Sequence, residues 1–205
     1  MRIAMWSGPR NLSTAMMYSF GARQDFTAMD EPFYAAYLKA TGLDHPMRDA
    51  VLAAQEQDPA RVPLGFVQDG ARHLYMKHMA QHMIDGFPLD WAEDCVNIHL
   101  IRHPARVIAS YAAKREAPRL ADIGFDRQLM LFERLGGLVI DSGDIRADPE
   151  GCCANSAPRS VCLSTLRCCT GLPDPAPRMG FGPRIGMGRS IKVPGLPGPR
   201  GICPC

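Results

Sequence analysis

The sequence has little of what marks a secreted or membrane protein. No stretch of about 18 apolar residues occurs anywhere, and the opening apolar run breaks at Gly8 and Pro9, too early for a signal peptide. Only one of the eight cysteines, Cys95, lies in the first 150 residues. These absences predict a cytoplasmic protein that does not enter a membrane and does not depend on disulfides.

Acidic residues are almost absent from residues 151–205. The formal net charge is only +2, yet residues 1–150 hold 16 of the 23 basic residues and 20 of the 21 acidic ones. This part has no basic stripe interleaved with aromatic residues, which argues against a nucleic-acid partner. A chain of 205 residues is long enough for one ordinary domain with a sizeable core.

Residues 151–205 differ in kind from the rest of the chain. They contain nine Gly, nine Pro and a single aromatic residue, Phe181, and they show no helical or strand period. This composition predicts a disordered or poorly packed tail. The cysteines at 152 and 153, and at 168 and 169, are adjacent and are not spaced as zinc ligands usually are.

The genetic code offers a second interpretation of this tail. A shift of one base from Cys152 onward permits a sequence with a helix, a Gly-Leu-Pro stop, acids and aromatics. Our hypothesis is that one base was lost near the codon for Gly151; a genuine basic disordered tail is the alternative. The predicted organisation is a truncated domain at 1–150, followed by a frameshifted or disordered tail at 151–205.

Within residues 1–150, apolar runs alternate with helical patterns. A strand is expected to pass directly into a helix that ends near Gly86, and a loop is expected at 117–124. The alternation predicts an α/β fold, with a parallel sheet covered on both faces and an incomplete C-terminal part. Strands are predicted at 2–7, 25–29, from 73 on, 95–102 and 138–141, and helical segments at 13–20, 32–40, 46–72, 106–114 and 126–135.

The turn after the first predicted strand reads SGPRNLSTAMM. Backbone N–H groups and the helix dipole form an anion site at such a strand-to-helix junction. The GxxxxGK[ST] pattern of a Walker A loop is absent. The structural alternative is a side-chain-capped helix with an exposed arginine.

A second motif, LIRHPARVIASYAAKR, follows the predicted strand at 95–102. Arg102 and Ser110 lie eight residues apart, so a strand end and the following helix can both reach one phosphate. An arginine suits such a bidentate contact. Arg106 either assists or lies on a solvated helix face.

Both motifs resemble segments of the sulfotransferase superfamily. The first resembles the 5′-phosphosulfate loop, close to PRSGST or PKSGTT: Pro9, Arg10, Ser13 and Thr14 match, whereas Asn11 and Leu12 replace a small residue and a glycine. The second resembles the 3′-phosphate segment: Arg102, Pro104, Val107, Ser110 and Tyr111 match, whereas His103 occupies a usually acidic position.

The resemblance implies a three-layer fold of the P-loop nucleotide-hydrolase type. It also implies a co-substrate, 3′-phosphoadenosine 5′-phosphosulfate, that donates a sulfuryl group to a hydroxyl on a small molecule or glycan without a metal. The donor would be held by Pro9, Arg10, Asn11, Leu12, Ser13, Thr14, Arg102 and Ser110. Arg10 would also neutralise charge on the bridging oxygen as sulfate leaves.

Glu31 resembles the acidic residue that serves as base in some bacterial members, and turn capping is the alternative. Asp30 is expected to point elsewhere, and Lys77 is expected to meet the donor. His78 and His82, four residues apart, are weighed as a helical metal pair, but no third ligand accompanies them. An ordinary surface or packing role is favoured for His82.

Two other functions stay open at this point. One is a P-loop kinase-like phosphotransferase, although the Walker A lysine is missing. The other is a non-catalytic nucleotide-binding protein, inactive because its C-terminal segment is lost. Relatives of this type are sometimes named after branched-chain aminotransferase-like proteins, but the sequence supplies no pyridoxal-phosphate site.

Overall fold

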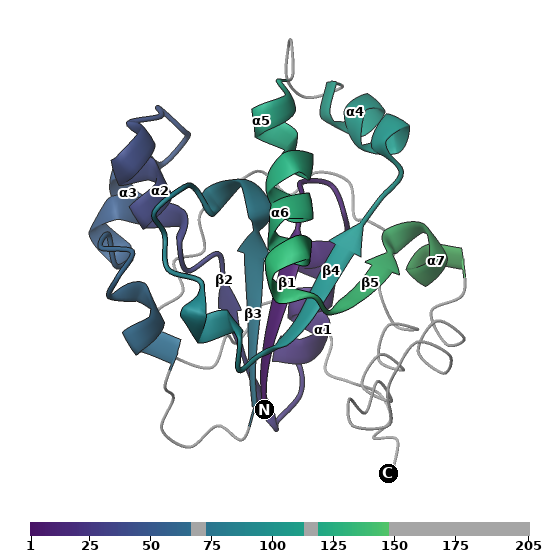
Figure 1. The fold of residues 1–205 in the computed structure, drawn as a ribbon, viewed down its shortest axis with the longest axis horizontal. Helices are drawn as coiled ribbons and strands as arrows, with labels where there is room; N and C mark the ends of the chain where they lie inside the picture. The colour runs from purple at the N-terminus through teal and green to yellow at the C-terminus, as the bar shows by residue number, and fades with distance from the viewer. Residues whose placement is uncertain (67–72, 113–118, 148–205) are drawn as a thin grey trace, which may run out of the picture.

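The computed structural model describes residues 1–66, 73–112 and 119–147. Its centre is a five-stranded sheet in the order β2-β3-β1-β4-β5, in which every neighbouring pair is parallel (Figure 1). The strands are β1 (Arg2–Ser7), β2 (Phe26–Asp30), β3 (His73–Met79), β4 (Val96–Ile101) and β5 (Leu138–Asp141). The predicted α/β fold with a central parallel sheet is confirmed.

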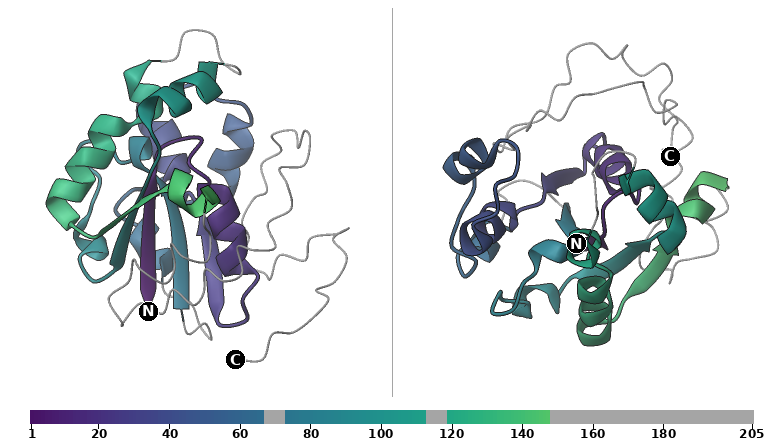
Figure 2. Two further views of the ribbon diagram at one scale, coloured as in Figure 1. Left: turned by 90° about the vertical axis from the view of Figure 1, so that its right-hand side faces the viewer. Right: turned by 90° about the horizontal axis from the view of Figure 1, so that it is seen from above.

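Helices lie on both faces of the sheet. Figure 2 shows α1 and α6 on opposite sides of the strands, which makes three layers. The helices are α1 (Ser13–Gly21), α2 (Tyr34–Thr41), α3 (Arg48–Ala54), α4 (Pro104–Ala112), α5 (Leu120–Ile123), α6 (Phe125–Leu135) and α7 (Ser142–Ala147), with short 3₁₀ turns at η1 (Val62–Phe66), η2 (Ala80–His82) and η3 (Asp90–Ala92).

The two halves of the core follow the alternation of side chains along β1. Ile3 and Met5 pack into the cluster that contains Phe20 of α1, whereas Ala4 and Trp6 join the cluster that contains Leu131 of α6. Successive strand residues point to opposite faces, so a strand covered on both sides reads as a continuous apolar run. This is why β1 was recognisable from sequence.

Strand register brings the functional segments to one edge of the sheet. Lys77 of β3 pairs with Met5 on one side and with Asp30 on the other, and Ser7 pairs with Leu100 of β4. The chain leaves β1 between β3 and β4, where the crossover connections diverge. In open parallel sheets this is the usual position of a ligand crevice.

Two local expectations are wrong. After β3 the chain makes only the single 3₁₀ turn Ala80–His82, so His78 lies on a strand and no helix carries the histidine pair. Helix α5 lies within the segment expected to be a loop. No helix in the described part of the chain is long and apolar enough to cross a membrane. The predictions for 151–205 lie outside the described residues.

Candidate functional site

The loop between β1 and α1 has two non-glycine residues in backbone conformations that usually require glycine. Arg10 and Leu12 adopt φ angles of 66° and 65°, in the left-handed region that costs a non-glycine residue roughly 1–2 kcal/mol. Helix α1 starts without a side-chain cap, and the amide of Met16 donates back to Leu12 O over 3.1 Å. The amides before Met16 therefore have no partner within the helix and can serve an anion.

Asn11 has a structural role within this loop. Its side chain is 1% exposed, and its Nδ2 donates to Leu100 O of β4 over 3.0 Å. The side chain thus fastens the loop to the sheet and is not exposed to a ligand. The alternative of a side-chain-capped helix is wrong, since no side chain caps α1.

The two sequence motifs meet, although about 90 residues separate them. Arg102 Nη1 donates to Arg10 O over 2.8 Å, and Arg10 Nε donates to Ser110 Oγ over 2.9 Å. Arg102 follows β4 and Ser110 lies on α4, so three segments contribute polar groups to one spot. From the sequence, Arg102 and Ser110 were expected at one phosphate and Arg10 at the bridging oxygen; the structure brings all three side chains together.

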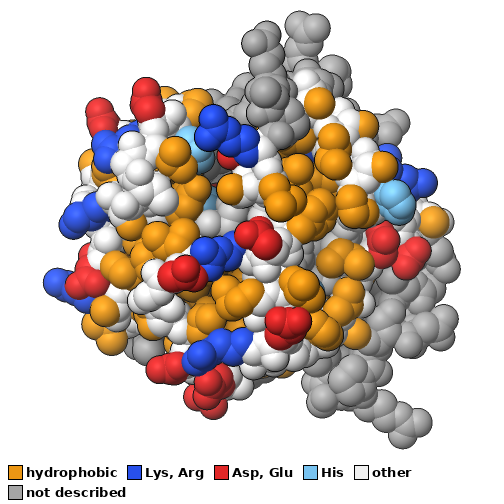
Figure 3. All heavy atoms as spheres, turned by 45° about the horizontal axis from the view of Figure 1, so that its top comes forward, with side chains coloured by type: hydrophobic (Ala, Val, Ile, Leu, Met, Phe, Trp, Pro, Cys, Tyr) orange, Lys and Arg blue, Asp and Glu red, His pale blue; other side chains and the backbone are white. Residues whose placement is uncertain are grey.

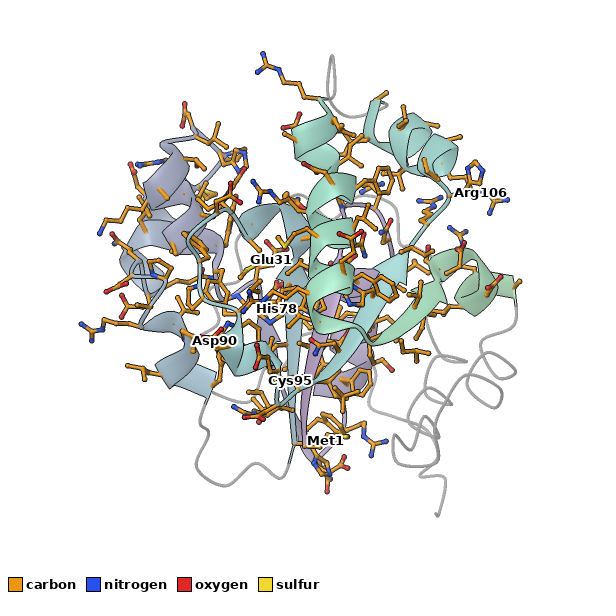
Figure 4. The ribbon with its side chains drawn as sticks, in the orientation of Figure 1. Met1, Glu31, His78, Asp90, Cys95 and Arg106 are labelled. Atoms are coloured by element: carbon orange, nitrogen blue, oxygen red, sulfur yellow. The ribbon has the colours of Figure 1, made fainter. Side chains whose placement is uncertain are left out.

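Further arginines surround this spot. The pKa of Arg102 is lowered by partial burial and then by the positive charges of Arg146, Arg106 and Arg10. Figure 4 shows Arg106 on the α4 side of the sheet edge, and its Nη1 lies close to Gly143 of α7. The carboxylate of Asp141 offsets part of this repulsion, and the positive charge that remains suits an anion.

An acidic cluster occupies the other side of the same edge, where Figure 4 labels Glu31 above His78. Lys77 Nζ donates to a carboxylate oxygen of Glu31 and, over 2.8 Å, to Asp30 Oδ1. The expectation that Asp30 points elsewhere is therefore wrong. The cause is the register, which places Asp30 directly beside Lys77. Lys77 itself faces these carboxylates, and its side chain is 5% exposed.

The charges in this cluster depend on each other. Burial alone would lower the pKa of Lys77, but the carboxylates of Glu31 and Asp30 more than offset it, so the pKa lies above its usual value. The pKa of Asp30 is raised by burial and by Glu31, against the opposing charge of Lys77. Glu31 also has a positive φ of 47°, and backbone strain of this kind gathers at functional sites.

His78 of β3 and His82 of the following turn are buried and neutral. His82 is stacked between the rings of Tyr34 and Tyr37, each 4.7 Å from its centroid, and His78 stacks on Trp6 at 4.6 Å. Burial lowers the pKa of each histidine to about 3. The packing role predicted for His82 is confirmed. No three His, Cys, Asp or Glu side chains come together as a metal site in the described ranges.

One residue near the loop was not anticipated. Gln128 of α6 is buried, and its Nε2 donates to Trp6 O over 3.2 Å and to Leu100 O over 3.0 Å. The only available signal was a glutamine on the apolar face of a helical pattern. That signal does not say which backbone oxygens the amide will meet.

Figure 3 tilts the carboxyl edge of the sheet toward the viewer. Basic and acidic side chains are interspersed on this face, with apolar side chains between them, and the coloured residues form no broad basic stripe there. The basic groups that matter for the site are therefore few and local. They are the arginines around the β1–α1 loop and the end of β4.

The fold and the loop define an α/β protein of the P-loop-like class, with a candidate anion site at the switch point of its sheet. Comparison with known proteins gives the family: the profile of the sulfotransferase domain matches residues 1–164, so the chain belongs to that family. Two branched-chain-amino-acid aminotransferase-like proteins of Arabidopsis thaliana, numbered 1 and 2, are 34% and 32% identical to the chain over 155 residues. Each match covers 72% of this chain but only 28% of the relative.

Proposed function

We propose that this chain binds 3′-phosphoadenosine 5′-phosphosulfate at the carboxyl edge of the sheet and transfers its sulfuryl group to a hydroxyl acceptor. Membership of the sulfotransferase domain family supports the reaction class. The observation that carries the proposal is the meeting of Arg10, Arg102 and Ser110 through two hydrogen bonds. Two arginines and a hydroxyl from three separate segments are a suitable set for one phosphate group.

The loop would hold the other end of the donor. The backbone amides from Arg10 to Thr14, with the hydroxyls of Ser13 and Thr14, would surround the 5′-phosphate at the positive end of α1. Arg10 is exposed, so its guanidinium can leave Ser110 and follow the charge on the bridging oxygen. A cation placed where charge develops lowers the barrier without covalent help.

Glu31 is the proposed base. The acceptor oxygen attacks sulfur, the bond from sulfur to the bridging oxygen of the 5′-phosphate breaks, and the acceptor proton moves to Glu31. Adenosine 3′,5′-bisphosphate leaves with the electron pair. Because Lys77 holds one carboxylate oxygen of Glu31, the other oxygen is the one available to a hydroxyl.

Nucleotide preference tests this proposal directly. The full chain is titrated with adenosine 3′,5′-bisphosphate and with ATP by calorimetry. We expect the bisphosphate to bind at least about tenfold more tightly, since the arginine cluster is worth more to a nucleotide that carries a 3′-phosphate. Tighter binding of ATP would overturn the sulfotransferase proposal in favour of a kinase-like phosphotransferase.

A second experiment separates an active enzyme from a non-catalytic nucleotide-binding protein. Donor turnover is compared between this chain and a version that carries the shifted reading frame from residue 152 onward. We expect greater turnover with the shifted tail than with the present one, and resequencing of the coding DNA across codons 140–205 should reveal the missing base. Equal turnover by both proteins would refute the lost-base hypothesis.

A further inference from the structure

We infer that Gln128, together with the side chain of Asn11, is a positioning device that holds the anion-binding loop in its glycine-like shape. The 5′-phosphosulfate loops that this loop resembles have a glycine where this chain has Leu12. Leu12 has a φ of 65° and Arg10 a φ of 66°, so both are in the left-handed region. Left-handed geometry is unfavourable for both residues, so an isolated loop of this sequence would relax. Something outside the loop must keep it in place.

Two buried amide groups supply that restraint: Asn11 fastens the loop itself to β4, and Gln128 ties the end of β1, from which the loop leaves, to the same strand. Gln128 Nε2 donates to Trp6 O and to Leu100 O, and Asn11 Nδ2 donates to the same Leu100 O. The three bonds link the end of β1, the loop, the end of β4 and helix α6.

The packing around Gly8 shows how closely the loop base is enclosed. A Cβ atom at Gly8 would lie 2.9 Å from Ile123 O at the end of α5, 3.6 Å from Asn11 Nδ2 and 3.9 Å from Gln128 Oε1. The base of the loop at Gly8 therefore packs closely against the end of α5 and lies near the amides of Asn11 and Gln128.

Two amide oxygens in this arrangement are buried without a hydrogen-bond partner, namely Asn11 Oδ1 and Gln128 Oε1. Buried polar atoms without partners are costly, so these amides are not present for stability alone. A leucine or methionine at either position would avoid that cost, but it would not bond the strand-end carbonyls. The unfavourable burial is consistent with a requirement for loop geometry at the site.

The inference rests on the proposed function for its ligand, adenosine 3′,5′-bisphosphate. Its test by hydrogen exchange needs no ligand. Gln128→Met removes the amide and keeps the side-chain length. We expect it to weaken binding of adenosine 3′,5′-bisphosphate about five- to tenfold, because the loop then spends less time in the binding shape. In a Leu12→Gly background the same substitution should cost no more than about twofold, since glycine accepts the left-handed backbone without restraint.

Asn97→Ala is the matched control, because Asn97 is also a buried amide on β4 and bonds Trp6 Nε1 and Ala92 O, away from the loop. It should lower the melting temperature but leave bisphosphate binding within about twofold. A purely structural role for Gln128 would make Gln128→Met behave like this control. Equal losses from Gln128→Met with and without Leu12→Gly would overturn the inference.

Hydrogen exchange of the ligand-free protein gives a readout that needs no nucleotide. Amides in the segment 8–14 should exchange about tenfold faster in Gln128→Met and return toward the original rate in the double variant with Leu12→Gly. If the bisphosphate does not bind at all, the proposed function fails, and exchange still decides the positioning role. Unchanged exchange in Gln128→Met would refute it.

Discussion

Replacement of Lys77 by methionine should destabilise the protein in a way that depends on pH. The ammonium group is almost fully buried and bonds both Asp30 and Glu31. Loss of one partner from a buried ion pair costs about 3–5 kcal/mol. Because the side chains of Asp30 and Glu31 are 42% and 22% exposed, water recovers part of that cost, and we expect a loss of about 2–4 kcal/mol at neutral pH.

For a domain of this size, that loss corresponds to a fall of roughly 6–12 °C in the melting temperature. Without Lys77, the pKa of Asp30 should rise further above its already raised value, because the main influence that opposes burial and Glu31 is then gone. A carboxyl group with a raised folded pKa favours the folded state at acid pH and disfavours it as the pH climbs from the unfolded to the folded pKa. The loss caused by Lys77→Met should therefore shrink between pH 7 and pH 4.

The assay is thermal unfolding followed by circular dichroism at pH 4, 5.5 and 7. Lys39→Met serves as control, since Lys39 is an exposed lysine on α2 and its replacement should change stability by no more than about 0.5 kcal/mol. A loss for Lys77→Met that is equal at pH 4 and pH 7, or no larger than that of the control, would show that the ion pairs do not form as described.

Three other outcomes are expected. Glu31→Gln should reduce sulfuryl transfer by about 10²–10⁴-fold in turnover number and change the affinity for adenosine 3′,5′-bisphosphate much less; an equal loss of affinity would argue against its role as base. Gly8→Ala should lower stability by about 1–3 kcal/mol, because the new methyl group would lie 2.9 Å from Ile123 O, whereas Gly65→Ala, with open space around it, should have little effect in the same denaturant titration. His82→Phe should make the protein less sensitive to acid. Because the pKa of His82 is about 3 in the folded state, the free energy of unfolding falls as the pH drops below about 6.5. Thermal melts from pH 6.5 to 4 should show that the variant loses about 1.4 kcal/mol per pH unit of this dependence.

Much of the fold follows from local patterns in the sequence. β1 and β5 begin and end where the apolar runs predicted. For β1 the reason is burial on both faces, which makes a strand read as an uninterrupted apolar segment. The turn after β3 was mispredicted as a helix, since helical and extended apolar segments of this length look alike in one sequence. Helix α5 is only four residues long, too short to leave a period.

The residues of the candidate site also differ in whether the sequence alone indicated them. Arg10, Arg102 and Ser110 were recognisable from sequence because each lies in a short motif at a strand-to-helix junction, where chain direction alone brings polar groups to the sheet edge. The pairing of Lys77 with Asp30 was not recognisable, since it depends on the register between β2 and β3. That register is decided by how the whole sheet packs.

The sequence by itself therefore determined the chemistry available at the carboxyl edge: a loop with backbone amides and an arginine, a second arginine with a serine, and an acidic pair. Only the tertiary structure decided which of these groups touch. It placed Arg102 on the carbonyl of Arg10, and it placed Gln128 beneath a loop that lies more than 110 residues away in the chain. Such contacts depend on crossover connections and side-chain packing between distant segments, and no local pattern in the sequence records them.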